Sequence, residues 1–178
     1  MEDFRIFRER ILEHNCILLS IHKESSNLMK EIEYKYLVDK EKWNQVKKPK
    51  PQKIIQGFLS TSEEVVVRVR IIDQQGFLTV KGKSSGIERS EFEYPIPVEE
   101  AKSILEEFTQ KQIIKNRFKI FIEDNLWEVD EFKGALEGLI LAELEVENKE
   151  YKFTLPDWAA EDVSTNPDFF NAVLIEKC

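Results

Sequence analysis

Two different hydrophobic periods divide the chain. Within residues 1–19, apolar side chains recur at helical spacing between charges, and a polar break follows at residues 23–27. From Lys30 onward the period changes to two, which is typical of β-strands. We therefore predict a helical N-terminal appendage over residues 1–29 and one strand-rich domain over residues 30–178. The apolar stripe of the appendage is formed by Phe4, Phe7, Ile11, Leu12, Cys16 and Leu19.

Alternating segments separated by short turn signals predict a series of strands. Sequential hairpins with few helices indicate an antiparallel sheet and an α+β fold. Asp39 is a predicted N-cap for a short helix over residues 39–46, and Pro97 precedes an amphipathic helix over residues 98–108. Short helices are also expected at 157–161 and 167–175. The strands are expected from Lys30 and over residues 53–60, 65–72, 76–83, 87–96, 113–123, 126–132 and 139–147.

The polar faces of these strands carry charge, whereas the opposite faces are apolar. Taken alone, a charged strand face usually lies in solvent. The helices over 98–108 and 167–175, however, need an apolar surface to pack on. If the apolar faces meet the helices outside, the charged faces enclose a shared interior, as in a closed barrel of about eight strands. The residues that share such faces are Glu31, Glu33 and Lys35; Arg68 and Arg70; Lys81 and Lys83; Arg89, Glu91 and Glu93; Lys115 and Arg117; and Glu143 and Glu145.

The net charge and the charged residues limit which ligands that interior could bind. The net charge of −8 disfavours a general nucleic-acid binder, which needs a basic face. A converging set of Arg and Lys side chains suits a polyphosphate, and the carboxylates suit Mg²⁺ or Mn²⁺. His14 and His22 lie in the appendage, so we expect no histidine base. The interior cations would be Lys35, Arg68, Arg70, Lys81, Lys83, Arg89, Lys115 and Arg117.

The remaining features indicate an ordinary intracellular protein. Cys16 and Cys178 lie at opposite ends of the chain and lack the spacing of a metal or redox pair. The longest apolar run near the N-terminus is too short to span a bilayer, and no signal peptide precedes it. We therefore expect a cytoplasmic protein without a membrane partner. A second subunit or the outside of the barrel could cover the N-terminal stripe, so a homodimer is one expectation.

The segment Glu31-Ile32-Glu33-Tyr34-Lys35 resembles the Glu-x-Glu-x-Lys signature of the CYTH superfamily, the triphosphate tunnel metalloenzymes. The likeness is strongest to the short bacterial members of the inorganic triphosphatase type. It covers about residues 30–177, and the ordered combination of blocks is far more specific than the signature alone. The further blocks are Gln56-Gly57-Phe58-Leu59-Ser60, Arg68-Val69-Arg70, Thr79-Val80-Lys81-Gly82-Lys83, Glu91-Phe92-Glu93-Tyr94, Lys115-Asn116-Arg117, Trp127-Glu128-Val129-Asp130-Glu131-Phe132 and Ala142-Glu143-Leu144-Glu145.

The resemblance implies a tunnel of eight antiparallel strands in which basic residues hold a triphosphate and acidic residues hold a divalent metal. Lys115 matches a position associated with activating or gating the attacking water. Glu143 and Glu145 are the favoured metal ligands and so belong to the catalytic set. The implied substrate contacts are Lys35, Arg68, Arg70, Lys81, Lys83 and Arg117. The implied metal positions are Glu31, Glu33, Glu91, Glu93, Asp130, Glu143 and Glu145.

The favoured reaction is metal-dependent hydrolysis of inorganic tripolyphosphate to pyrophosphate and phosphate. Thiamine triphosphatase, nucleoside or RNA triphosphatase and class IV adenylate cyclase are alternatives within the superfamily, because all share the tunnel. A non-catalytic polyphosphate or nucleotide sensor is the alternative of another class. Arg89 is open between a phosphate contact and an ion-pair partner for Glu91 or Glu93.

Overall fold

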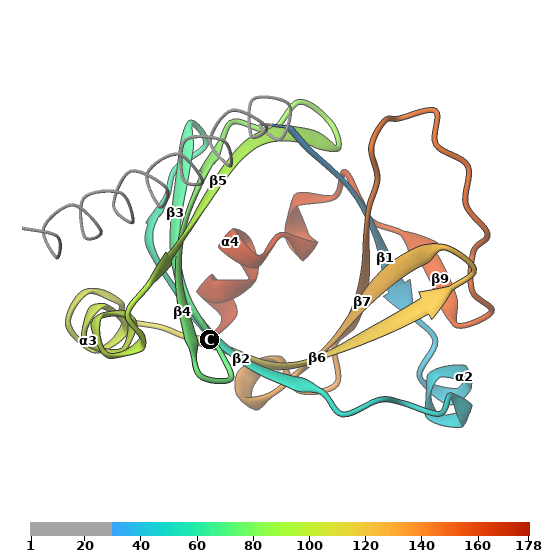
Figure 1. Cartoon of the computed structure of the whole chain (residues 1–178), viewed down its shortest axis with the longest axis horizontal. Helices are drawn as coiled ribbons and strands as arrows, with labels where there is room; N and C mark the ends of the chain where they lie inside the picture. The colour runs from blue at the N-terminus through green and yellow to red at the C-terminus, as the bar shows by residue number, and fades with distance from the viewer. Residues whose placement is uncertain (1–29) are drawn as a thin grey trace, which may run out of the picture. The chain divides into compact units, whose positions relative to one another are not determined.

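The computed structural model describes residues 30–178, so the predicted N-terminal helix lies outside the described residues. The strands form one antiparallel sheet in the order β5-β4-β3-β2-β6-β7-β8-β1-β9, and a further pairing of β5 with β1 closes it into a barrel (Figure 1). The predicted eight-stranded antiparallel barrel is therefore confirmed, with one added strand. The strands are β1 (Lys30–Val38), β2 (Gln52–Thr61), β3 (Val65–Ile72), β4 (Gln75–Gly82), β5 (Glu88–Ile96), β6 (Ile113–Ile122), β7 (Asn125–Phe132), β8 (Ile140–Glu145) and β9 (Ala159–Asp162).

The short strand β9 replaces the helix predicted over residues 157–161, so that prediction was wrong. Opposite its β8 side, β1 pairs near its start with the chain leading into β5, where the Glu33 amide donates to the Ile87 carbonyl at 3.1 Å. The second half of β1 would be left without partners there. The β9 segment fills this edge, with Tyr36 opposite Asp162. Backbone groups that need partners thus override the weak helical signal.

The predicted helices over 39–46 and 98–108 are confirmed. Asp39 caps α2 (Lys40–Gln45) by accepting hydrogen bonds from two backbone amides of the first turn. Helix α3 (Val98–Phe108) packs its buried Ala101 and Leu105 on the outer residues Val69 and Ile71. Within residues 30–178, no helix is long and apolar enough to cross a membrane. The shorter helical elements are η2 (Gly134–Leu136), η3 (Pro167–Phe169), α4 (Asn171–Leu174) and η4 (Ile175–Lys177).

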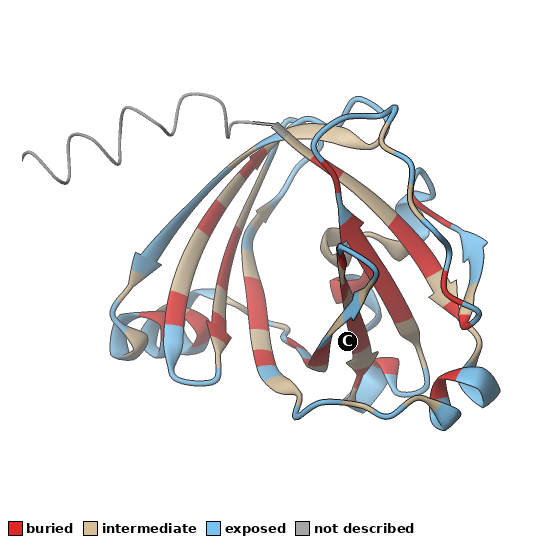
Figure 2. Cartoon of the chain, turned by 45° about the vertical axis from the view of Figure 1, so that its right-hand side comes forward, coloured by how far each residue is buried: buried red, intermediate tan, exposed pale blue. Residues whose placement is uncertain are grey.

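An aromatic core covers the outside of β1, β6, β7 and β8. Trp43 of α2, Trp127 of β7 and Trp158 pack edge to face, with ring centroids 5.4 Å apart for Trp43 and Trp158 and 5.6 Å apart for Trp127 and Trp158. The Trp43 indole also donates to Glu131 at 2.9 Å. Trp127 and Trp158 are thus residues of the packed core. Figure 2 shows buried bands on these strands, because one side faces this core and the other faces the interior.

The C-terminal helical segment closes one end of the barrel interior. Leu174 and Ile175 form a buried cluster with Ile113, Phe132 and Leu141. Those three residues alternate in step with the charged residues of β6, β7 and β8, so they belong to the interior face. Figure 1 accordingly draws α4 within the ring of strands. The expectation that residues 167–175 pack outside was therefore wrong: at this end the inward faces are apolar and bind the helix.

Candidate functional site

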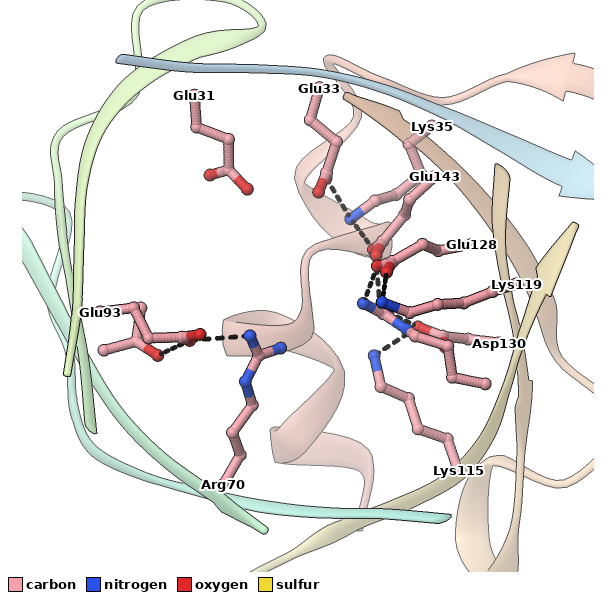
Figure 3. Close-up of polar contacts among 12 residues, drawn as sticks. Glu31, Glu33, Lys35, Arg70, Glu93, Lys115, Lys119, Glu128, Asp130 and Glu143 are labelled. Atoms are coloured by element: carbon pink, nitrogen blue, oxygen red, sulfur yellow. Dashed lines mark hydrogen bonds and ion pairs between the residues drawn. The ribbon is translucent and has the colours of Figure 1, made fainter. Parts of the chain in front are cut away.

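The inward faces of the strands gather a dense set of paired charges. Figure 3 shows Glu31, Glu33 and Lys35 of β1 pointing into the barrel, whereas Ile32 and Tyr36 belong to the outer aromatic core. This confirms the orientation predicted from the alternating pattern. The buried charged side chains are Lys35, Arg68, Lys81, Lys115, Arg117, Asp130 and Glu143.

Arg117 is the centre of the charge cluster on β6, β7 and β8. Its Nε and Nη2 donate to the two oxygens of Asp130 at 2.7 and 2.6 Å, and Nη2 also reaches Glu143 at 2.6 Å. Nη1 pairs with Glu128. Lys115 donates to Asp130 at 2.5 Å. All three guanidinium nitrogens of Arg117 are therefore engaged by carboxylates.

Lys35 links β1 to the same cluster. Its Nζ lies 3.0 Å from Glu143 and 3.2 Å from Glu33. Burial lowers the pKa of Lys35, but these two carboxylates outweigh it and raise the pKa above its ordinary value. The Lys35 backbone amide donates to Ser164 Oγ at 2.8 Å, which fixes the strand from outside the cluster. Lys35 is therefore held as a charged group.

A second cluster lies on β3, β4 and β5. Arg70 donates to Glu93 at 2.7 Å, and Thr79 donates to the same oxygen at 2.8 Å. Arg68 Nη2 donates to Thr79 at 3.2 Å. Lys81 lies 2.7 Å from Glu91. Most cations of this second cluster are thus paired with carboxylates from the neighbouring strands.

Glu31 joins the second cluster to β1. It pairs with Lys81 at 3.0 Å and with Arg89 at 2.8 Å. Burial opposes its ionisation, but Lys81, a hydrogen bond with Glu91 and Arg89 together hold the pKa of Glu31 well below its usual range. Arg89 is therefore an ion-pair partner here, although for Glu31 rather than for the two carboxylates of its own strand.

Burial also shifts the pKa values of two basic groups and one acid. The pKa of the Lys115 amine is lowered to about 8, mainly by desolvation, which Asp130 opposes. The pKa of Arg68 is lowered to about 10 by burial and by the neighbouring Arg70. Burial and the hydrogen bond with Glu31 raise the pKa of Glu91 to about 7.

Lys83 is not brought into the interior clusters. Its side chain is 56% exposed and pairs with Glu64 at 2.7 Å, near the β3–β4 rim. Glu145, by contrast, lies opposite Glu33 in the β1–β8 register but forms no ion pair with any described residue. The remaining predicted residues all lie in one cluster or the other.

Sequence reasoning missed several polar residues of the interior. Glu128 accepts from Arg117 and Thr79 links Arg68 to Glu93, yet neither was assigned a role. Strand alternation would have found Glu128, which shares a face with Asp130. Gln56 of β2, fully buried on the inward face, was also missed.

The carboxylates supply the right donors for a hard divalent cation. Glu145 shows this most clearly: burial, followed by the charges of Glu31, Glu33 and Glu128, raises its pKa. Carboxylates that repel one another in this way favour a bound cation, and oxygen-only donors suit Mg²⁺ or Mn²⁺. Over residues 30–178, however, no three acidic, His or Cys side chains already stand at metal-ligand spacing. These carboxylates suit a divalent cation, and all of them except Glu145 are at present paired with interior cations.

The comparisons with known proteins agree with this architecture. The model of the CYTH domain family matches residues 29–170. An inorganic triphosphatase of Acetivibrio thermocellus is 41% identical over 148 residues, which are 83% of this chain and 94% of that protein. Enzymes of this family are metal-dependent.

Solved structures show the same fold. The structure of the inorganic triphosphatase NE1496 is similar with a TM-score of 0.57 at 26% identity, covering 82% of this chain and 93% of that one. A putative adenylate cyclase from Bacillus halodurans has a TM-score of 0.56 at 18% identity, covering 68% of this chain and 83% of that one. The second likeness concerns the fold alone.

Proposed function

Because the chain belongs to the CYTH domain family, we propose that it hydrolyses inorganic tripolyphosphate to pyrophosphate and phosphate with Mg²⁺ or Mn²⁺. The observation that carries this proposal is the convergence of cations in one interior that is closed at one end. Only a ligand with several negative charges can use so many cations at once. These cations are Lys35, Arg68, Arg70, Lys81, Arg89, Lys115 and Arg117.

Binding would proceed by exchange of partners. Phosphate oxygens replace the carboxylates that now neutralise Arg70, Lys81 and Arg89, which frees Glu93, Glu91 and Glu31. The freed carboxylates, together with Glu145, are the groups that would hold the metal. A bound Mg²⁺ or Mn²⁺ supplies neutralisation of phosphate charge and a water of lowered pKa.

The cations have distinct roles in the proposed reaction. Arg68 and Arg70 orient the phosphates through their fork of donors, and Lys35 contributes a fixed charge. Lys115, whose pKa lies near 8, takes the proton of the attacking water. The rigid placement of these charges stabilises the transferring phosphoryl group without reorganisation.

We expect the protein to release phosphate from tripolyphosphate with Mg²⁺ or Mn²⁺ and to be inactive in excess chelator, because phosphate charge then lacks its metal partner. Phosphate release is measured against ATP, thiamine triphosphate and pyrophosphate as competing substrates. Either metal should restore turnover after chelation. Full activity in chelator would contradict the metal requirement. Thermal stabilisation by tripolyphosphate without turnover would instead favour the polyphosphate sensor.

Substitution of Arg70 should affect mainly substrate binding, whereas substitution of Glu143 should affect mainly the chemical step. We expect Arg70→Ala to raise KM, because it removes charge-assisted hydrogen bonds worth about 1.5–3 kcal/mol. Glu143→Gln should lower kcat more than it changes KM, because it removes a charge beside Lys35 and Arg117. Steady-state kinetics check both, with Lys102→Ala on the outer helix α3 as the exposed control. Equal small effects of both substitutions would show that these roles are wrongly assigned.

A further inference from the structure

Gln56 is buried in the barrel without the partners that its amide requires. Its side chain is 0% exposed, and within residues 30–178 neither Nε2 nor Oε1 has a hydrogen-bond partner. It lies directly opposite Arg70 in the β2–β3 register, so both side chains belong to the inward face. An unpaired buried polar group costs about 1–3 kcal/mol. That cost is offset when a ligand supplies the missing partner.

The neighbouring strand β3 also carries buried hydrogen-bonding atoms without partners. The Nε atoms of Arg68 and Arg70 are also buried and unpaired, although Nη2 of each side chain has a partner. Across the barrel, Arg117 uses all three of its nitrogens. Unused hydrogen-bonding groups of the inward faces therefore concentrate on β2 and β3.

The spare groups of Gln56 and Arg70 are complementary. Directly opposed residues on neighbouring strands have Cβ atoms about 4.5–5.5 Å apart, within reach of a side-chain hydrogen bond. Arg70 Nε offers a donor and Gln56 Oε1 an acceptor. At present the Arg70 guanidinium is drawn toward Glu93, so the two do not meet.

We propose that Gln56 is a further substrate-binding residue, whose Oε1 accepts from Arg70 Nε while its Nε2 donates to a phosphate oxygen of the bound triphosphate. This inference rests on the proposed function. Release of Arg70 from Glu93 by the entering triphosphate lets Arg70 Nε turn to Gln56 Oε1. A glutamine suits this position because it accepts from arginine and donates to phosphate at the same time.

The test is Gln56→Met, which keeps the length of the side chain and removes both hydrogen-bonding atoms. We expect kcat/KM for tripolyphosphate to fall about 10- to 100-fold, the range for a hydrogen bond to a charged group. The melting temperature of the ligand-free variant should be unchanged or higher, because an unpaired buried amide is gone. A loss of activity with a gain of stability is not expected of a merely structural residue.

The matched control is Ile55→Met, the adjacent residue of the same strand, whose side chain packs against the outer cluster that contains Val69 and Leu105. It should leave kcat/KM near the wild-type value. Unchanged kcat/KM in Gln56→Met, with or without a lower melting temperature, would overturn the inference. If the wild type releases no phosphate, the proposed function fails on its own. In that case the shift in melting temperature caused by tripolyphosphate tests the role of Gln56. A smaller shift in Gln56→Met than in the wild type supports the inference, and equal shifts or no shift in either protein overturn it.

Discussion

Replacing Arg117 with methionine is expected to abolish turnover and to lower the free energy of unfolding by about 3–5 kcal/mol, the typical cost of breaking a buried ion pair from one side. Arg117 neutralises Asp130, Glu143 and Glu128 at once. Without it, the fully buried Asp130 keeps only Lys115 as a cationic partner. The cost arises from carboxylates left in a desolvated interior. Denaturant unfolding of the ligand-free protein measures it.

The matched control is Lys119→Met on the same face of β6. Lys119 also pairs with Glu128, at 3.0 Å, but its side chain is 46% exposed. Exposed pairs contribute about 0–1 kcal/mol because solvent screens them. We therefore expect Lys119→Met to change stability little. Equal losses in the two variants would show that Arg117 does not hold the interior carboxylates.

The barrel was predictable because its signal is distributed over many strands. Alternation at residues such as Val67, Arg68 and Val69 is repeated on each hairpin. Because the helices need the apolar faces to pack on, a closed sheet with the charged faces inside is favoured over an open one. The inward direction of Glu31, Glu33 and Lys35 followed from the same pattern. A periodic signal of this kind needs no knowledge of long-range contacts.

The errors concern segments whose structure depends on distant partners. The β9 segment is too short for periodicity to identify, and it becomes a strand only because β1 has a free edge beside Tyr36. Leu174 and Ile175 pack inside because Ile113 and Leu141 form an apolar end to an otherwise charged interior. Both outcomes depend on tertiary contacts rather than on local sequence.

Which charged side chains form ion pairs inside the site could likewise not be predicted from the sequence. Alternation places Arg89 and Glu31 on inward faces, but the pair between them follows from how β5 and β1 approach one another. Lys83 shares a face with Lys81, yet it lies at the rim, where it binds Glu64 instead. Period two determines the face of a residue and leaves its depth in the barrel undetermined.

Lys115 is expected to control how turnover depends on pH. Burial lowers the pKa of its amine to about 8, so the neutral form that can accept a proton from water becomes common as pH rises through that value. We expect kcat of the wild type to rise with pH up to a plateau above about 8. Lys115→Met should lower kcat by about 10²–10⁴-fold, the usual contribution of a positioned general base. Phosphate-release rates across pH 6–9.5 measure both effects.

Lys115→Arg distinguishes a proton acceptor from a fixed charge, because arginine stays protonated throughout this range. If Lys115 takes the proton, the arginine variant keeps stabilisation by tripolyphosphate but loses the rise of kcat with pH. A pH profile that matches the wild type would show that Lys115 acts only through its charge.

Stability gives an independent check on the state of Lys115. Between pH 8 and about 10.4, the amine is neutral in the folded protein and protonated in the unfolded chain. The unfolded state therefore binds more protons, and this group makes the free energy of unfolding rise by about 1.4 kcal/mol per pH unit. Below pH 8 the amine is charged in both states, so this group no longer makes the free energy of unfolding change with pH. The difference in unfolding free energy between the wild type and Lys115→Met should accordingly shift in favour of the wild type as pH rises through this window, and a constant difference would contradict a lowered pKa.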